Sequence, residues 1–322
     1  MKSIEDFILL VQEEIKQYHF PKQPKGLYEP LDYFLKIGGK RLRPVLTLLG
    51  ADLFGGDIQK ALKPAMGIEL FHNFTLVHDD IMDDAPLRRG QSTVHEKWNL
   101  NTAILSGDVL FVDAFEKVSD VDQPFLKEVL KVFVQTAREV CEGQQKDMDF
   151  ESELDVTEEE YIHMIQFKTS VLLGCALQIG AIISGAAKSD AEHLYQFGLS
   201  LGTSFQIKDD YLDAFGDPEK FGKQVGGDII SNKKTILLIK ALEFASAEQK
   251  RTLLALLNAS DLDQKVRDVK QLYNETGSSD YALAQIENYY QESIAHLDQI
   301  NASSKSKERL YGFADWLKNR DL

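Results

Sequence analysis

The stretch AMGIELFHNFTLVHDDIMDD, residues 65–84, decides the fold. As a helix, it would carry apolar residues on nearly every side as far as Met82, so it would have no polar face to leave in water. Such a helix is buried on all sides in a folded protein. Yet the stretch ends in four aspartates, and acid groups on a buried helix need a physical reason.

A second stretch, FGLSLGTSFQIKDDYLD at residues 197–213, repeats the pattern. Asp79 and Asp83 in the first stretch, and Asp209 and Asp213 in the second, stand four residues apart, so each pair shares a helix face. Like charges at that spacing repel, and near an apolar core they need cations to neutralise them. A single such cluster could be a solvated helix end, but two point to a hard ion. Carboxylates without cysteine or paired histidines suit Mg²⁺, which fills its remaining positions with water and substrate phosphate oxygens.

The rest of the chain has the pattern of helices packed into one bundle. Apolar residues recur at spacings of three and four, only 8 prolines interrupt the 322 residues, and few stretches alternate like strands. Turn signals cut the chain into helical lengths without a linker. We therefore expect an all-α fold with a single domain over residues 1–322. Residues 1–18 mix acidic and apolar positions, which predicts an amphipathic helix rather than a signal peptide, and we expect a cytoplasmic protein.

The charge and the hydropathy of the sequence limit the classes of partner that the protein can bind. A net charge of −15 repels a phosphate backbone, so nucleic acid is excluded as a partner. Residues 171–187 are apolar but shorter than the ~20 residues of a bilayer span, which predicts a core helix and no membrane span. The basic residues gather in three clusters that indicate small anionic ligands: Lys36, Lys40, Arg41 and Arg43; Arg88 and Arg89; Lys233 and Lys234.

From residue 36 to residue 235 the chain resembles the trans-isoprenyl diphosphate synthase, or polyprenyl synthetase, family, whose motifs it carries in order. The C-terminal third carries no motif and is similar only in being helical. The motifs are GGKRLRP (38–44), the first aspartate cluster followed by LRRG (87–90), FKT (167–169), FQ (205–206) before the second cluster, FGK (221–223), GD (227–228) and NKKT (232–235). The implied fold is one large helical bundle of the isoprenoid synthase type with a central cavity.

The resemblance also implies a role for each matching residue. Isopentenyl diphosphate would be held by Lys40, Arg43, His72 and Arg89. The allylic diphosphate would be held by Arg88, Lys168, Lys223 and Lys233. Magnesium would be coordinated by Asp79, Asp83 and Asp209, with Asp80, Asp84, Asp210 and Asp213 in supporting positions of the metal site. Beside the reacting carbon would lie Thr169 and Gln206.

The implied activity is a magnesium-dependent prenyl transfer. Three Mg²⁺ ions and the lysines would draw charge off an allylic diphosphate of 5–15 carbons until its carbon–oxygen bond breaks. The alkene of isopentenyl diphosphate would then attack the allylic cation, and the chain would grow by five carbons. Arginine's planar fork matches phosphate oxygens and lysine supplies a point charge, so the basic clusters suit two diphosphates. Family members are typically homodimers.

Product length follows from the residues below the first cluster. In this family a bulky residue there limits the growing chain, and Phe74 lies about 7.5 Å down the helix from Asp79, with Phe71 deeper. The wheel angle between Phe74 and Asp79 is about 140°, so helix geometry alone leaves this floor open. The first cluster lacks the two extra residues typical of bacterial farnesyl synthases, and in that respect it resembles the archaeal geranylgeranyl type. A C15 and a C20 product both stay open, with C20 slightly preferred.

Two rival readings remain. A class I terpene cyclase shares the helical bundle and the first cluster, but it typically replaces the second with a mixed Asn/Ser/Glu motif. A non-catalytic partner subunit that binds prenyl diphosphates usually loses aspartates. Residues 209–213 argue against the cyclase, and the completeness of both clusters argues against the silent subunit.

Overall fold

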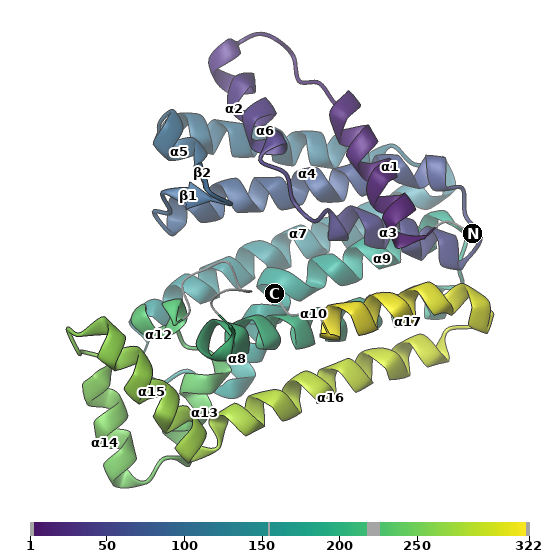
Figure 1. Ribbon diagram of the computed structural model, residues 1–322. Coiled ribbons are helices and arrows are strands. Elements are labelled where there is room, and N and C mark those ends of the chain that lie inside the picture. The colour runs from purple at the N-terminus through teal and green to yellow at the C-terminus, as the bar shows by residue number, and fades with distance from the viewer. Residues whose placement is uncertain (1–2, 154, 218–225, 320–322) are drawn as a thin grey trace. The chain divides into compact units, whose positions relative to one another are not determined.

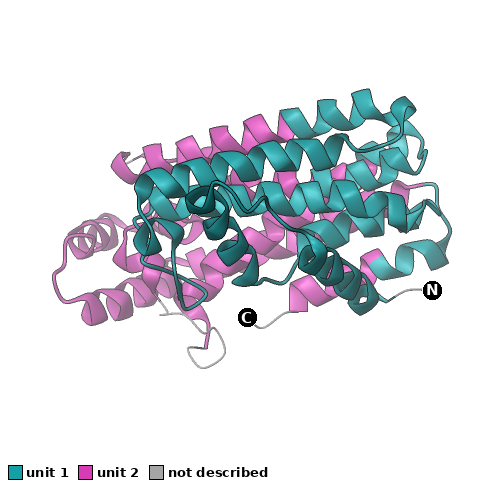
Figure 2. Cartoon of the chain, turned by 90° about the horizontal axis from the view of Figure 1, so that it is seen from above, with its two compact units in different colours: residues 1–134, 175–192, 301–309 teal, residues 135–174, 193–300, 310–322 magenta. Residues whose placement is uncertain are grey.

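The computed structural model describes residues 3–153, 155–217 and 226–319. Within these ranges the chain is helical apart from one two-stranded hairpin, which confirms the predicted all-α class (Figure 1). The chain divides into two compact units, coloured separately in Figure 2. Unit 1 comprises residues 1–134, 175–192 and 301–309; unit 2 comprises residues 135–174, 193–300 and 310–322. The single domain over residues 1–322 stays a prediction.

Unit 1 contains the N-terminal helices and the hairpin. Its elements are α1 (Ile4–Gln17), α2 (Lys25–Lys36), α3 (Leu42–Leu53), α4 (Ile58–Met82), β1 (Leu87–Arg88), β2 (Gln91–Ser92), α5 (Val94–Lys97) and α6 (Leu100–Ser119). Helix α4 packs along α6 and α3, and its residues 64–71 are all buried. At Gly67 the backbones of α4 and α6 approach so closely that a Cβ on this glycine would lie 2.8 Å from the Ala114 carbonyl oxygen. This confirms the predicted burial for residues 64–71. Beyond Phe71 most positions are only partly buried and Met82 is 50% exposed, so the prediction of a helix buried on all sides is wrong for its last turns.

Helix α1 confirms the predicted amphipathic N-terminal helix. It begins with a capping box, in which the Asp6 backbone N–H donates to Ser3 Oγ (3.2 Å) and the Ser3 N–H donates to the Asp6 carboxylate (2.7 Å). Phe7 and Val11, one turn apart, are its buried residues.

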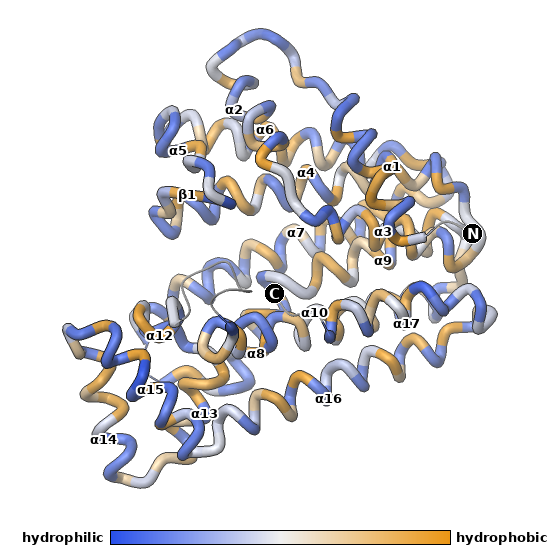
Figure 3. Tube along the Cα trace, viewed as in Figure 1, coloured by the Kyte–Doolittle hydropathy of each residue, from blue (hydrophilic) through white to orange (hydrophobic). Residues whose placement is uncertain are grey.

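Unit 2 is built around a core of its own. Its elements are α8 (Glu158–Ile165), the π-helix η1 (Gln166–Ser170), α12 (Gly227–Ile230), α13 (Ile236–Phe244), α14 (Ala247–Leu256), α15 (Leu262–Thr276) and α16 (Ser278–Gln299). Helix α13 packs against α8, α15 and α16, and it contributes Ile236 and Leu237 to a core that includes Tyr161 and Val269. Hydrophobic and hydrophilic positions mix along α16, which buries one side and exposes the other (Figure 3).

Four further helices have residues in both units: α7 (Gln123–Ser152), α9 (Val171–Ile183), α10 (Lys188–Phe215) and α17 (Ser304–Asn319). One helical run of the described chain, Glu158–Ile183, is long and apolar enough to cross a membrane by length and composition alone. In its most apolar window 72% of the residues are buried within the chain itself. Such burial is typical of a core helix and agrees with the core helix predicted at residues 171–187; the absence of a membrane span stays a prediction.

Candidate active site

The first acidic cluster lies at the C-terminal end of α4. Asp79 is half-buried in the last turn, and the exposed Asp83 is the C-cap, its backbone N–H donating to the Asp79 carbonyl oxygen (2.9 Å). The two aspartates therefore stand one turn apart, as predicted. A helix C-terminus carries partial negative charge, so carboxylates are least favourable there. The local fold thus increases the need for a cation beside this pair.

Asp80 in the same turn faces a different partner. It is 1% exposed, and both of its carboxylate oxygens accept from Arg88 Nε (2.8 and 2.9 Å), while Arg88 Nη2 lies 2.6 Å from Asp80 Oδ1. Arg88 sits on the β1–β2 hairpin, whose two turn residues, Arg89 and Gly90, have φ of 52° and 76°. Positive φ at both positions gives the tight turn that a two-residue hairpin needs. Asp80 thus contacts Arg88, a residue predicted to bind the allylic diphosphate. The predicted role of Asp80 in the metal site stays a prediction.

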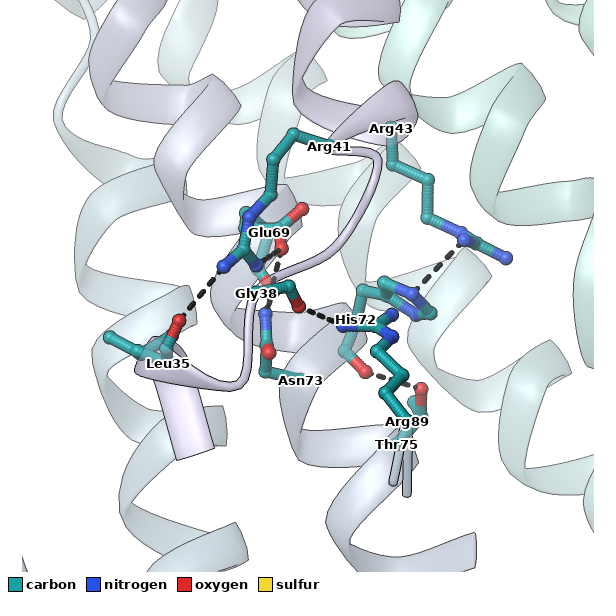
Figure 4. A network of polar contacts seen from close by, with 9 residues as sticks. All are labelled: Leu35, Gly38, Arg41, Arg43, Glu69, His72, Asn73, Thr75 and Arg89. Carbon is teal, nitrogen blue, oxygen red and sulfur yellow. Dashed lines mark hydrogen bonds and ion pairs between the residues drawn. The ribbon is translucent and has the colours of Figure 1, made fainter. Parts of the chain in front are cut away.

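Arg43, His72 and Arg89 form a basic group in unit 1 (Figure 4). Arg43 Nη1 donates to His72 Nε2 (3.1 Å). Because a guanidinium only donates, the His72 ring accepts at Nε2 and carries its proton on Nδ1. Burial and the neighbouring arginines, Arg43 first among them, lower the pKa of His72 well below its ordinary value. His72 is therefore a neutral ring with one N–H left to donate.

Arg89 is held by the loop that precedes α3. Its Nη1 donates to the Gly38 carbonyl oxygen, and a Cβ on Gly39 would lie 2.7 Å from the same nitrogen. Glycine at 39, with φ of 155°, leaves room for the guanidinium. Lys40 is the next residue and is exposed. The structure thus brings Arg43, His72 and Arg89 together, with the Lys40 backbone beside them.

Sequence reasoning missed the buried network beneath this group. Arg41, with φ of 54°, is 7% exposed; it pairs with Glu69 of α4 and donates to the Leu35 carbonyl oxygen (2.9 Å). Asn73 Nδ2 donates to the Glu69 carboxylate (2.9 Å) and to the Glu69 backbone oxygen (2.6 Å). Figure 4 shows this network next to His72. Arg41 lies in a predicted basic cluster, but its contacts fix the loop that carries Lys40.

The second acidic cluster lies in the last turns of α10, in unit 2. Asp210 is 3% exposed and accepts from the Tyr161 hydroxyl (2.7 Å) and from Gln206 Nε2 (3.1 Å). Burial raises the pKa of Asp210 to about 6. Asp209 and Asp213 are partly buried. The predicted role of Gln206 beside the reacting carbon is untested; its observed partner is Asp210.

Cations accompany this cluster too. Lys233 Nζ lies 3.8 Å from Asp228 Oδ1. Burial by itself lowers the pKa of Lys233, but Asp210 and then Asp228 outweigh it and raise the pKa above its ordinary value. The Asp228 backbone N–H donates to Asp213 Oδ2 (2.9 Å), so the GD motif is attached to the cluster. Sequence reasoning noted the motif but gave Asp228 no role.

Lys168 and Thr169 lie on the π-helix η1, which no periodicity predicted. Lys168 Nζ donates to Asp147 of α7 (2.5 Å). No motif or spacing in the sequence had indicated Asp147 as its partner. At Gly143 the α7 backbone comes so close that a Cβ would lie 2.2 Å from the Lys168 backbone nitrogen. Single π-turns inside helices are frequent at functional sites. The remaining predicted ligand, Lys223, lies outside the described residues with the rest of its FGK motif.

Each unit thus holds one acidic cluster with basic residues beside it. The convergence of the two clusters on one cavity stays a prediction. A further group, Asp84, His95 and Glu96, offers three ligand atoms within 4.8 Å of one another. Asp84 and Glu96 are exposed, and exposed acidic groups are common without a metal, so we assign no ion there.

Comparison with known proteins gives consistent matches. The profile of the polyprenyl synthetase family matches residues 24–276. A geranylgeranyl pyrophosphate synthase of Geoglobus acetivorans is 41% identical over 321 residues, which cover 99% of this chain and 98% of that protein. A crystal structure of a geranylgeranyl pyrophosphate synthase superimposes with a TM-score of 0.95 at 44% identity, covering all of both chains. The corresponding enzyme of Pyrococcus horikoshii gives 0.92 at 37% identity, covering 98% of this chain and 97% of that one. These matches do not favour the terpene cyclase or the silent subunit.

Proposed function

This chain belongs to the polyprenyl synthetase family as a short-chain trans-prenyltransferase, and we propose that it condenses isopentenyl diphosphate with an allylic diphosphate to make geranylgeranyl diphosphate (C20). One observation carries this proposal. Helices α4 and α10 each end in two aspartates one turn apart, and in each unit cationic side chains stand beside them. Acid groups that need a divalent ion, next to bases that suit phosphate, are what ionisation of a diphosphate requires.

The metal site we propose fits Mg²⁺ by its donor set. Its ligands are carboxylate oxygens at helix C-termini, where only a cation relieves the unfavourable charge. Asp79, Asp83 and Asp209 would hold the ions directly, and Asp80, Asp210 and Asp213 would support them. When bound, about three Mg²⁺ would neutralise the departing diphosphate, in line with the Lewis-acid role of such ions.

The side chains of this protein would bind the two diphosphates and stabilise the allylic cation. Neutral His72 has its Nδ1–H to donate to the diphosphate of isopentenyl diphosphate, beside Lys40, Arg43 and Arg89. Arg88, Lys168, Lys223 and Lys233 would bind the allylic diphosphate, and Thr169 and Gln206 would turn oxygen dipoles to the allylic cation. Asp80 would keep the Arg88 guanidinium oriented, since both carboxylate oxygens bind it.

The proposed product length rests on an aromatic cluster. Phe74 is half-buried and packs against Phe71 of its own helix (centroids 5.5 Å apart) and Phe111 of α6 (5.1 Å, stacked). Phe71 is fully buried and also contacts Phe133 of α7 (5.3 Å). Because Phe74 is packed against these aromatic rings, we expect it to stay in place and to stop the growing prenyl chain. Relatives named geranylgeranyl synthases support C20, whereas others are named geranylfarnesyl diphosphate synthases. C15 is the alternative product.

We also propose a cytoplasmic homodimer that pairs through α6. This helix exposes large apolar side chains that a monomer would leave in water, among them Leu105 (56% exposed) and Val112 (66% exposed), seven residues apart on one side. Val112→Glu should therefore lower the molar mass measured by light scattering, while the same change at the exposed Val134 of α7 serves as a control. An unchanged mass for Val112→Glu would remove α6 from the interface.

The experiment that tests the activity is incubation with labelled isopentenyl diphosphate and C5, C10 or C15 primers, with and without Mg²⁺, followed by product sizing. We expect C20 product from each primer and none without the metal. Product at C15 only would replace the proposed chain length, and a cyclic hydrocarbon without chain growth would refute the prenyl transfer.

A further inference from the structure

Lys265 on α15 is a buried cation with an unusual set of partners. It is 2% exposed, and its Nζ donates to the Ile230 carbonyl oxygen (3.1 Å), to Asn232 Oδ1 (2.6 Å) and to the Leu257 carbonyl oxygen (3.2 Å). An ammonium group has three N–H donors, and these three oxygens use all of them. All three partners are neutral, so the group acts as a three-way hydrogen-bond anchor rather than as half of an ion pair.

Through these three oxygens Lys265 joins the C-terminal ends of two helices, α12 and α14. Ile230 is the last residue of α12, and Leu257 is the C-cap of α14, where carbonyl groups lack partners within their helix. Asn232 lies between them, with φ of 57°, and its Nδ2 donates to the same Leu257 oxygen (3.1 Å). Residues 230–232 are therefore held by their backbone and by a side chain at once.

The next residue along the chain is Lys233, whose place is set from both sides. On one side Asp213 of the second acidic cluster accepts from the Asp228 N–H (2.9 Å), and the Lys233 N–H donates to the Asp228 carbonyl oxygen (2.9 Å). On the other side stands the anchor made by Lys265. A turn tied at both ends leaves the ammonium group of Lys233 little freedom to move away from the acidic cluster.

We infer that Lys265 is a positioning residue for the allylic substrate: its three hydrogen bonds hold residues 230–232 so that Lys233 stays beside Asp228 and the second acidic cluster. This rests on the proposed role of Lys233 in binding the allylic diphosphate. Lys265 itself is buried behind the turn, and its three N–H donors are used by protein oxygens, so none is left for a substrate. Loss of the Lys265 side chain should therefore raise KM for the allylic substrate and leave KM for isopentenyl diphosphate unchanged.

The test compares KM values for the two substrates in variants of the full chain. Lys265→Met keeps the length of the side chain and removes its donors. We expect it to raise KM for the allylic diphosphate at least fivefold while KM for isopentenyl diphosphate stays within twofold. Lys250→Met, which removes an exposed lysine of α14, should change neither. Equal rises in both KM values, or no rise in the allylic one, would overturn the inference.

A double variant shows whether Lys265 acts through Lys233. If it does, adding Lys265→Met to Lys233→Met should change the allylic KM by less than twofold, because the group to be positioned is already gone. Undiminished effects in the double variant would overturn the inference. If Lys233→Met alone leaves the allylic KM unchanged, the proposed role of Lys233 fails; if it raises KM and Lys265→Met does not, the inference alone fails.

A second route covers the case in which Lys265→Met does not fold. Asn232→Gly removes the shortest of the three contacts from the turn side, and glycine accepts the positive φ at this position. It should reproduce the selective rise in allylic KM, and normal KM values for both substrates would count against the anchor.

Discussion

Replacing Glu69 by glutamine tests the buried ion pair beneath the proposed isopentenyl diphosphate site. The exposed fractions of the two side chains are 5% for Arg41 and 3% for Glu69. Removing one member of a buried pair leaves the other charge without its partner, which costs about 3–5 kcal/mol. Glutamine keeps an oxygen that still accepts from Asn73, so we expect the lower end, about 3 kcal/mol.

The assay is urea unfolding followed by circular dichroism, with the free energy of unfolding as the readout. The control is Asp120→Asn, which breaks the pair with Lys63, whose members are 53% and 55% exposed. Exposed pairs are worth about 0–1 kcal/mol, so the control should unfold almost as the natural chain does.

A double variant decides whether the pair itself is the stabilising unit. Glu69→Leu leaves the Arg41 guanidinium buried alone, and adding Arg41→Met removes that charge as well. The double variant should therefore be more stable than Glu69→Leu, because two apolar residues replace an isolated charge. The reasoning is refuted if Glu69→Gln costs less than about 1 kcal/mol. It is also refuted if the stability losses of Glu69→Leu and of Arg41→Met, each measured alone, simply add in the double variant.

Three further results are expected. Asp79→Ala should lower turnover at least about 100-fold with the helical fold intact, since metal neutralisation of a leaving group is worth several kcal/mol; near-native turnover with Mg²⁺ would remove Asp79 from the metal site. Phe74→Ala should lengthen the product by one or more five-carbon units on chromatography, and an unchanged length would show that Phe74 is not the floor. The Asp210 carboxyl, whose pKa burial raises from 3.8 to about 6, stabilises the metal-free protein below about pH 4 and loses that contribution as the pH rises to about 6. A protonated Asp210 adds no negative charge to support the proposed metal site, so the Mg²⁺ concentration for half-maximal activity should rise as the pH falls from about 7.5 to about 5.5. Equal Mg²⁺ concentrations at the two pH values would contradict this role of Asp210.

Local sequence predicted several elements because their determinants are close in the chain. The amphipathic helix near the N-terminus, the apolar stretch that became α4 and the four-residue spacing of Asp79 and Asp83 all depend on neighbours within a turn or two. A helix places such residues by its own geometry, whatever it packs against. The predicted all-α class and the family follow from the same local patterns.

The partners of the candidate site residues were not predictable in this way. Arg41 and Glu69 lie far apart in the sequence, as do Lys168 and Asp147, and no spacing rule relates the members of either pair. The π-helix at residues 166–170 likewise lies where α7 comes close at Gly143, and no periodicity in the sequence predicted it. Packing between helices decides these contacts, so residues with equal charge in the sequence receive different roles.

The sequence by itself determined that the chain is helical, that two apolar helices end in acid groups and that basic residues lie near them along the chain. Each of these follows from composition and short-range spacing. Only the tertiary structure decided that Arg41 stabilises a loop, that Asp80 binds Arg88 and that Lys265 anchors the turn before Lys233. A side chain's role depends on which distant groups surround it after folding, and that information is absent from any window of neighbouring residues.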